Sequence, residues 1–344
     1  MTRFITQALG ERRLARVRPP VAPVARIAIN MRPIFAAWGG GNQWLLQIAR
    51  YLQYSGYHVQ YDLGGEPVDC ILMNHGGLTG KLSISLDEVK AYRKRHPRVA
   101  VVHRINDNDV RKKTTEMDAR LARFDEVADH TVFISEWLRD HHAAHWFNLA
   151  KPHSCILNGA DPAVFHPVGG RAWSGREPLR LVTHHWSDNW MKGFGVYQQI
   201  DEMIARDELP GIELWIIGRW PKEITWRRAH TAPPANGAAL ASLLRKCHVY
   251  VTASLHEPGG MHFIEGLQCG LPLIYHEDGG GIPELGAPYG LGFRDDVAGA
   301  VRAIRDRYAE YRERTLAAPP SGDGMCHAFR QVIQATLARK HARS

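Results

Sequence analysis

The sequence predicts an α/β protein with two doubly wound parallel-sheet domains that face a cleft. The chain has 344 residues, 44% of them hydrophobic, which is enough for two cores at about 150 residues per domain. Short apolar segments alternate with segments of helical periodicity, which is typical of parallel sheets. The alternation stops at residues 167–178, which are rich in Gly, Pro and Arg, and then starts again. Two successive α/β domains follow from this pattern.

Six strands are predicted in the first half of the chain. Residues 24–31 (VARIAINM) and 68–73 (VDCILM) are short apolar runs, which indicate strands. After the first strand, three glycines precede residues 42–54, whose apolar side chains recur at helical spacing. The other predicted strands are 57–63, 98–103, 130–134 and 154–157, and the other predicted helices are 86–95, 117–127 and 135–146.

The second half restarts with a strand at 179–183, followed by a helix at 194–206. Residues 212–217 (IELWII) and 249–253 (VYVTA) are rich in the β-branched and aromatic side chains that strands favour. The remaining predicted elements are helix 238–247, a helix beginning at 263, strand 272–275, and helices 298–308 and 325–339.

These elements divide the chain into four segments. Residues 1–24 form a basic leader, 25–168 an N-terminal Rossmann-like domain, and 169–324 a C-terminal domain. Residues 325–344 form a basic helix that we expect to pack back on the N-terminal domain. Because doubly wound sheets bind ligands outside the carboxyl ends of their strands, we expect the functional site in the cleft.

The net charge of +8 is placed unevenly. Residues 1–170 hold 22 basic and 16 acidic residues, whereas the second half is nearly balanced. A basic chain fits nucleic acid, an anionic membrane surface or an acidic small molecule. The basic runs 93–96 and 111–113 lack adjacent aromatic residues, so we expect no nucleic acid partner. The leader, 93–98 and 111–113 are candidates for contact with an anionic membrane or glycan.

Cysteine usage and hydropathy indicate the compartment. The five cysteines are scattered without CxxC spacing, which is typical of free thiols in a reducing compartment. No apolar run approaches the length of a bilayer span. We therefore expect a cytoplasmic protein with peripheral contact at the inner face of a membrane. The histidines at 141, 142 and 145 have helical spacing but no evident Cys or carboxylate partner, so no metal site is predicted.

The strongest chemical signal is residues 256–266 (HEPGGMHFIEG), between a strand and a helix. Gly259 and Gly260 permit close backbone approach, and the helix N-terminus offers free N–H groups and a positive dipole. Glu257 and Glu265 are suitable acceptors for sugar and ribose hydroxyls. The alternative for Glu265 is a solvated helix residue, which its apolar neighbours disfavour.

The spacing of these two glutamates resembles the E-x7-E signature of glycosyltransferase family 4, the group 1 glycosyltransferases, whose members have the GT-B fold. Three further segments resemble motifs of that family in the same order, and the resemblance covers about residues 25–310. These segments are Leu157–Asp161 with Phe165 and Pro167, Trp190–Phe194, and Gly270–Ile274 with Gly279–Glu284.

The resemblance implies roles for individual residues. Lys192 would bind the donor's diphosphate, Glu265 the ribose hydroxyls and Glu257 the donor sugar, which makes Lys192 and Glu257 candidate catalytic residues. The backbone amides of Gly259, Gly260 and Met261 would line the sugar and phosphates. Gly40 and Gly41 would form the glycine-rich loop of the first domain, or else a plain turn.

Two further positions are less regular. His103 closes predicted strand 98–103, where such enzymes often keep a histidine facing the donor sugar, and it is a candidate catalytic residue. Its alternative is a strand-end histidine bonded to backbone. The Arg that the family usually has shortly before the Lys is absent from residues 183–191. We expect His185 or its neighbour His184, or Arg219 after Gly218, to replace it.

The resemblance implies a retaining, hexosyltransferase-type enzyme that moves a sugar from a nucleotide-sugar to an acceptor hydroxyl. It implies no metal and no other cofactor, and Asp107-Asn108-Asp109 is interpreted as helix-capping acids rather than a metal motif. The acceptor is expected to be a glycan, a lipid-linked glycan or a small molecule, as in bacterial polysaccharide or glycoconjugate biosynthesis. Alternatives are a nucleotide-sugar epimerase on the same fold and a non-catalytic sugar- or nucleotide-binding homologue.

Overall fold

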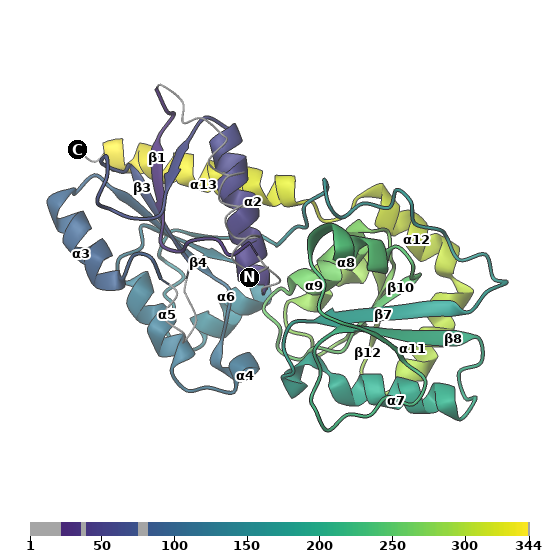
Figure 1. Cartoon of the computed structure of the whole chain (residues 1–344). Coiled ribbons are helices and arrows are strands. Elements are labelled where there is room, and N and C mark those ends of the chain that lie inside the picture. The colour runs from purple at the N-terminus through teal and green to yellow at the C-terminus, as the bar shows by residue number, and fades with distance from the viewer. Residues whose placement is uncertain (1–21, 36–38, 75–81, 343–344) are drawn as a thin grey trace. The chain divides into compact units, whose positions relative to one another are not determined.

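The computed structural model describes residues 22–35, 39–74 and 82–342 (Figure 1). Contacts divide the chain into two units: unit 1 comprises mainly the residues up to Leu157 and those from Asp323 onward, and unit 2 comprises mainly Asn158–Gly322. The boundary lies before the expected position, 168/169. The reason is that Ala160 forms a β-bridge with Ser321, which ties the segment after Leu157 to unit 2. Most of the expected leader, 1–24, lies outside the described residues.

Unit 1 contains a six-stranded, entirely parallel sheet in the order β2-β1-β3-β4-β5-β6. The order reverses between β1 and β3, as in doubly wound folds. Its strands are β1 (Arg26–Ile29), β2 (His58–Gln60), β3 (Cys70–Asn74), β4 (Ala100–Ile105), β5 (His130–Phe133) and β6 (His153–Cys155). Its helices are α2 (Gly40–Tyr54), α3 (Leu86–Arg95), α4 (Asp109–Lys112), α5 (Met117–Asp125), α6 (Glu136–Ala143) and α13 (Gly322–Ala342).

Successive residues of the strands in unit 1 pack on opposite faces of its sheet. Val102 of β4 belongs to the core under α2 and α13, where the rings of Trp44 and Phe329 lie 5.3 Å apart. Val101 belongs to the core on the other face, with Val89 of α3. Figure 1 shows α2 and α13 beside the same strands. The last helix of the chain therefore completes the core of the first unit.

Unit 2 contains a second six-stranded parallel sheet, in the order β12-β11-β10-β7-β8-β9. This is the strand order of dinucleotide-binding folds, and it reverses between β7 and β10. The strands are β7 (Leu179–His185), β8 (Ile212–Gly218), β9 (His230–Ala232), β10 (Val249–Thr252), β11 (Leu273–His276) and β12 (Gly290–Phe293). The helices are η2 (Trp190–Lys192), α7 (Phe194–Ala205), α8 (Gly237–Leu244), α9 (Met261–Gln268), α10 (Ile282–Gly286), η3 (Ala287–Tyr289), α11 (Val297–Asp306) and α12 (Tyr308–Ala317).

Two cores also flank the sheet of unit 2. Leu181 and Val251 pack on the face that carries α7 and α11, whereas Val182 and Tyr250 pack on the face that carries α8 and α9. All eight residues of α9 are buried. Among the described helices of both units, none combines the length and apolar character needed to cross a membrane.

Candidate functional site

Three loops meet at the carboxyl edge of the sheet in unit 2, next to the point where its strand order reverses. They follow β7, β10 and β11. The N–H of Leu255 donates to the carbonyl of Met191 (2.9 Å), which joins the first two loops. The N–H of Gly281 donates to the carbonyl of Glu257 (2.9 Å), which joins the second and third. This edge is where doubly wound sheets bind ligands.

Gly193 lets the first loop approach the second. Its φ is +84°, and a Cβ there would lie 2.2 Å from the carbonyl oxygen of Ala253. A side chain is excluded by both the dihedral and the contact. Gly193 also ends the short helix η2, so its conformation fixes the position of the preceding residue, Lys192.

Lys192 and Glu257 form an ion pair across these two loops. The Lys192 Nζ lies 2.5 Å from the Glu257 Oε2, and the side chains are 12% and 7% exposed. Two largely buried opposite charges stabilise each other, and removing one leaves the other uncompensated. The structure thus brings together two of the predicted catalytic residues, 65 positions apart in the sequence.

Glu265 is buried one and a half turns into α9 and is held by a histidine. The His184 Nε2 lies 2.9 Å from the Glu265 Oε2. The Tyr250 hydroxyl accepts from the backbone N–H of His184 and lies 3.0 Å from the ring Nδ1 of His184. An ionised carboxylate can only accept, so the Nε2 of His184 carries the proton of its bond to an ionised Glu265, and the Tyr250 hydroxyl can then donate to Nδ1. This three-residue chain was not expected, because 81 residues separate His184 from Glu265.

His185 points into the interior of unit 2. Its Nε2 lies 3.0 Å from the Tyr197 hydroxyl and 3.1 Å from Thr183 Oγ1. Burial, followed by the nearby His262 and Lys192, holds the pKa of His185 well below its ordinary value. The ring is therefore neutral at physiological pH. This arrangement contradicts the expectation that His185 supplies a phosphate-binding positive charge.

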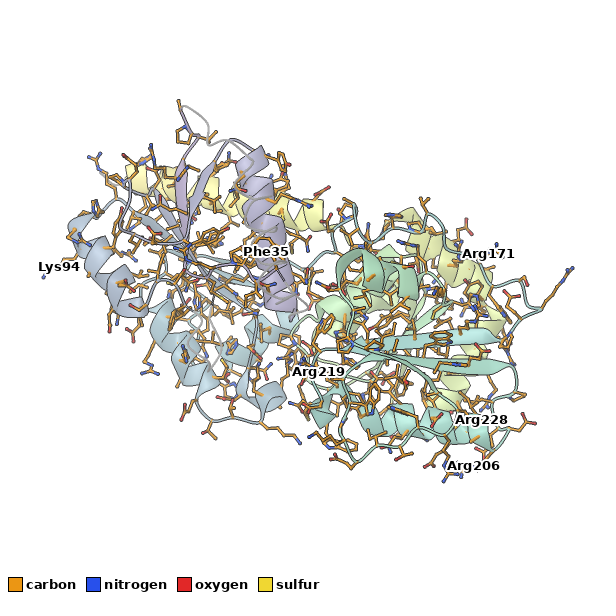
Figure 2. All side chains as sticks on the ribbon, viewed as in Figure 1. Phe35, Lys94, Arg171, Arg206, Arg219 and Arg228 are labelled. Carbon is orange, nitrogen blue, oxygen red and sulfur yellow. The ribbon has the colours of Figure 1, made fainter. Side chains whose placement is uncertain are left out.

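Arg219 remains as the candidate for that second positive charge. It is exposed and follows Gly218, the last residue of β8. A Cβ on Gly218, whose φ is +116°, would lie 2.0 Å from the carbonyl oxygen of His185. The Arg219 guanidinium donates to the carbonyl of Trp186 (3.3 Å), at the start of the loop that carries Lys192 (Figure 2).

The predicted amide-lined segment lies at the N-terminus of α9. Gly260 is the N-cap residue in an extended conformation, and it has no side-chain oxygen to accept from the N–H groups of the first turn. The Asn158 side-chain amide donates to the carbonyl of Gly259 (2.6 Å), which anchors the segment from within unit 2. Met261 begins the helix. These N–H groups and the helix dipole favour an anionic or hydroxyl-bearing ligand.

His103 does not lie at the end of its strand. β4 continues to Ile105, and the His103 ring is completely buried, with its Nδ1 3.1 Å from the Asp125 Oδ1. Asp125 also accepts from Thr131 Oγ1 (2.6 Å) and from Lys151 Nζ (2.5 Å). The ring therefore belongs to the interior of unit 1, which contradicts its expected position facing a ligand.

Gly40 and Gly41 are the first two residues of helix α2; Gly41 belongs to unit 1, whereas contacts assign Gly40 to unit 2. A Cβ on Gly41 would lie 3.4 Å from the Asn106 side-chain nitrogen and 3.7 Å from that of Asn74. Asn74 ends β3, and its Oδ1 accepts from the buried Arg104 (3.0 Å). Gly41 thus lies at the carboxyl edge of the first sheet, beside polar side chains that the sequence did not predict as neighbours.

The acidic run at 107–109 caps helices. The Asn108 side chain accepts from the N–H of Arg111 (2.8 Å) at the start of α4. Asp109 accepts from the N–H groups of Met117 (2.9 Å) and Asp118 (3.0 Å) at the start of α5. These bonds match the interpretation of the run as capping residues.

One group of side chains in unit 1 has metal-ligand chemistry. Asp118, His141 and His142 each place a ligand atom within 4.8 Å of the others. The expectation that these histidines lack a carboxylate partner is therefore wrong, because His141 Nε2 lies 3.1 Å from Asp118 Oδ2. His142, however, uses both ring nitrogens, toward the carbonyl of Asp107 (3.0 Å) and the indole N–H of Trp146 (2.9 Å). The group is a hydrogen-bonded cluster rather than an open ligand set.

The chain is similar to known proteins in sequence over part of its length and in fold over most of it. Residues 202–310 match the family model for glycosyl transferases group 1. The chain is similar to sucrose-phosphate synthase from Thermosynechococcus elongatus, with 17% identity, 92% of this chain and 100% of that chain covered, and a TM-score of 0.65. A search of curated protein sequences gives no match.

Two other solved structures share the fold at TM-scores of 0.63. Anabaena HepE, in complex with UDP and glucose, is 13% identical over 90% of this chain and 99% of that chain. The catalytic domain of starch synthase IV from Arabidopsis thaliana, bound to ADP and acarbose, is 11% identical over 92% of this chain and all of that chain. At these identities the likeness shows the fold, and the chain has the two-domain GT-B architecture.

Proposed function

We propose that the protein transfers a sugar from a nucleotide-sugar to an acceptor hydroxyl with retention of anomeric configuration. The match of residues 202–310 to the family model for glycosyl transferases group 1 supports this proposal. The observation that carries the proposal is the ion pair of Lys192 and Glu257 at the carboxyl edge of the sheet of unit 2, next to the point where its strand order reverses. Glu265, paired with His184, lies on α9, which follows β10. Fold neighbours solved with UDP or ADP add support, since both ligands are the nucleoside diphosphates that such donors release.

In this proposal the diphosphate takes the place of Glu257 as the partner of Lys192. The positive charge is already desolvated and held by Gly193, so it needs little reorganisation when the ligand binds. Arg219 and the N–H groups at the start of α9 contribute the remaining stabilisation of negative charge. Glu257, released from Lys192, contacts hydroxyls of the donor sugar.

Glu265 accepts the ribose hydroxyls. The proton on His184 Nε2 faces one carboxylate oxygen and favours the ionised form, which is the form that accepts hydrogen bonds. The other oxygen is the proposed acceptor toward the ligand. His184 is a positioning residue in this account, since it acts through Glu265.

The proposed reaction requires no metal, no cofactor and no protein nucleophile. The bond between the anomeric carbon and the diphosphate breaks, and the bond to the acceptor oxygen forms on the same face. The acceptor proton passes to an oxygen of the departing diphosphate. The protein stabilises the charge that develops on that diphosphate and excludes water.

We assign donor binding to unit 2 and acceptor recognition to unit 1. The acceptor class is a glycan, a lipid-linked glycan or a small molecule, in a cytoplasmic pathway of polysaccharide or glycoconjugate synthesis, with no nucleic acid partner. Contact with an anionic membrane is the proposed role of the positive charge of unit 1.

The experiment that tests the proposal is a thermal-shift screen of the full chain against UDP-, GDP-, ADP- and dTDP-sugars. A ligand that binds the folded state raises the melting temperature. We expect one donor class to do so, with the shift lost in Glu265→Gln and kept in Glu202→Gln, a matched change at an exposed residue of α7. No shift with any donor contradicts the proposal. An altered free sugar formed without acceptor would instead identify an epimerase.

A further inference from the structure

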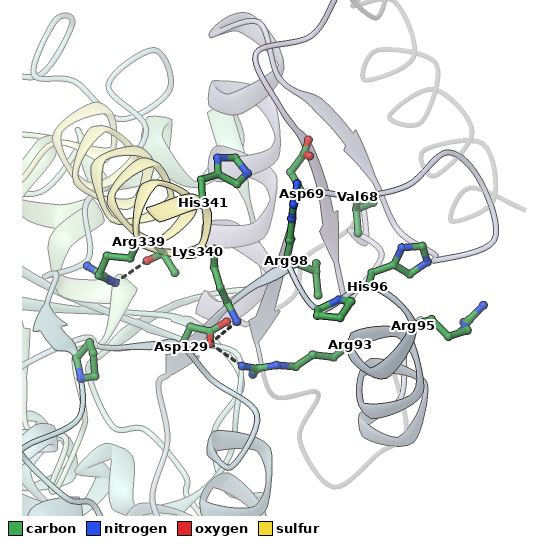
Figure 3. A pocket seen from close by; sticks show the side chains of 14 residues that line it. Val68, Asp69, Arg93, Arg95, His96, Arg98, Asp129, Arg339, Lys340 and His341 are labelled. Carbon is green, nitrogen blue, oxygen red and sulfur yellow. Dashed lines mark hydrogen bonds and ion pairs between the residues drawn. The ribbon is translucent and has the colours of Figure 1, made fainter. Parts of the chain in front are cut away.

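A pocket lies in unit 1, at the amino edge of its sheet (Figure 3). Its floor is formed by residues just before β3, β4 and β5, including Asp69 and Asp129. Its walls come from the end of α3 and the last turn of α13, which are far apart in the sequence. The cavity has a volume of about 890 Å³. Ligands of doubly wound sheets bind at the opposite, carboxyl edge, so this pocket is separate from the site proposed above.

The pocket is strongly basic. Its lining includes five Arg or Lys side chains and only two carboxylates, those of Asp69 and Asp129. Asp129 is already paired with Arg93 (2.6 Å) and with Lys340 (2.9 Å), as the dashed lines in Figure 3 show. Asp69 accepts from the backbone N–H of Arg26 (2.7 Å). Both negative charges are therefore engaged.

Helix dipoles explain only part of this charge. Basic residues in the last turns of α3 and α13 complement the negative ends of those helices, each equivalent to about half a charge. Counting both helix ends and both aspartates leaves an excess of roughly two positive charges. Two or more negative charges on a ligand would balance it.

The side chains that carry the excess are available. Arg95 and Arg98 are exposed and form no ion pair with any described residue. Arg339 donates to His130 Nδ1 (3.1 Å). Burial, and then Arg339 itself, lowers the pKa of His130 to about 4, so the imidazole is neutral and leaves the charge of Arg339 uncancelled.

We propose that this pocket binds a ligand bearing a diphosphate or two phosphate groups. Guanidinium groups form bidentate, charge-assisted hydrogen bonds with phosphate. Besides Arg93, which pairs with Asp129, three more arginines line a cavity larger than one phosphate requires. The diphosphate belongs either to a free small molecule or to a lipid headgroup. The inference does not depend on the proposed glycosyl transfer, because it uses only unit 1.

The test measures binding of inorganic pyrophosphate to the full chain by titration calorimetry at low and high salt. We expect the double variant Arg95→Gln/Arg98→Gln to bind about tenfold more weakly, since two charge-assisted contacts are lost. The matched control Arg206→Gln/Arg228→Gln removes two exposed arginines of unit 2 and should bind as the wild type does (Figure 2). Arg95 also lies over the ring of the buried Tyr92 (5.7 Å), and Arg206 pairs with Glu208 (2.9 Å). Unchanged circular dichroism melts verify that both double variants fold.

Lys192→Ala separates this pocket from the donor site. Pyrophosphate binding that survives Lys192→Ala and weakens in Arg95→Gln/Arg98→Gln supports the inference. Binding that Lys192→Ala abolishes and the double variant leaves unchanged overturns it, while leaving the proposed function intact. No binding by the wild type also overturns it.

Vesicles distinguish the two sources of the ligand. Cosedimentation with phosphatidylcholine vesicles that contain phosphatidylinositol 4-phosphate, whose headgroup carries two phosphates, would support the pocket and identify a headgroup if it is lost in the double variant. Pyrophosphate binding by the pocket without cosedimentation would support it and identify a soluble ligand. Cosedimentation that persists in the double variant, with unchanged pyrophosphate binding, would contradict it.

Discussion

Each unit contains a buried pair of a histidine and a carboxylate, and the two pairs have similar distances but different positions. His103 and Asp125 lie 3.1 Å apart in unit 1, and His184 and Glu265 lie 2.9 Å apart in unit 2. Asp125 is further bonded to Thr131 and Lys151, in the interior between β4 and α5. Glu265 lies beside the loops at the carboxyl edge of its sheet. We infer that position relative to the sheet edge, rather than the pairing itself, distinguishes Glu265, the proposed ligand-binding carboxylate, from the interior carboxylate of Asp125.

The largest effect is expected in unit 2, on the rate of sugar transfer at the proposed donor site. Lys192→Ala should lower the rate of sugar transfer about 10²- to 10³-fold, because a preorganised charge on the leaving group is lost. Initial rates with the donor found in the screen measure this. Lys246→Ala, an exposed lysine at the amino edge of the same sheet, is the control and should retain activity. Equal rates for the two variants would contradict the assigned role.

A substitution in the pair of His103 and Asp125 should change the stability of the protein rather than its activity. Asp125→Asn leaves Lys151 and His103 without a buried carboxylate, and we expect a loss of about 3 kcal/mol in the free energy of unfolding. Urea denaturation measures it. Transfer activity per folded molecule should remain close to that of the wild type. A large drop in activity with unchanged stability would place Asp125 in the catalytic machinery and reverse the comparison.

A smaller effect is expected at Tyr250, which supports the other pair. Tyr250→Phe removes the hydroxyl that fixes the His184 ring and leaves a buried N–H without its acceptor, at a cost of about 1–3 kcal/mol. Binding of the nucleotide should weaken about tenfold because the Nε2 proton is no longer held toward Glu265. Calorimetric titration tests this, and unaltered affinity would show that the tautomer is unimportant.

The smallest effect concerns pH. Burial is the main cause that holds the pKa of His142 near 4 and the pKa of His185 well below its ordinary value of 6.5. The unfolded chain therefore binds protons near pH 6.5 that the folded chain does not. Stability should fall as the pH drops below about 6.5, by on the order of 1 kcal/mol per pH unit for each such histidine. Urea midpoints at pH 7.5 and 5.5 measure this, and a higher midpoint at pH 5.5 would contradict it.

Asp125 titrates in the opposite sense. Burial raises its pKa, but the hydrogen bonds and charges of His103 and Lys151 prevail, so the folded pKa lies below the ordinary 3.8. Its contribution is complete above that value and is lost as the pH falls through the folded pKa. The stability difference between the wild type and Asp125→Asn should therefore narrow only below about pH 4.

Strands and motifs that depend on the local pattern of residues were predictable from the sequence. The apolar runs at 68–73 and 249–253 became β3 and β10, and the spacing of Glu257 and Glu265 located the main cluster. Strands β9 and β12 were missed: β9 is a three-residue edge strand, and β12 contains two glycines, which strands disfavour.

Contacts between distant residues were not predictable. Nothing local indicates that His184 meets Glu265 or that His103 meets Asp125. The predicted strand 98–103 stops before Arg104, and an arginine is rarely buried. In the structure, Arg104 is 1% exposed and lies 4.4 Å from the centre of the Trp44 ring. Likewise, the opposite directions of His184 and His185 could not be read from β7, because both faces of that strand are buried.

The most direct test of the central claim is calorimetric titration of the nucleoside diphosphate found in the screen into Glu265→Gln and Asp125→Asn. The side-chain amide of Glu265→Gln can still accept a hydrogen bond from His184, so the fold should be kept. The ionised carboxylate that accepts the ribose hydroxyls is lost. We expect the affinity for the nucleoside diphosphate to be at least tenfold weaker in Glu265→Gln and unchanged in folded Asp125→Asn. Unchanged affinity for Glu265→Gln, or an equal loss in both, would contradict it.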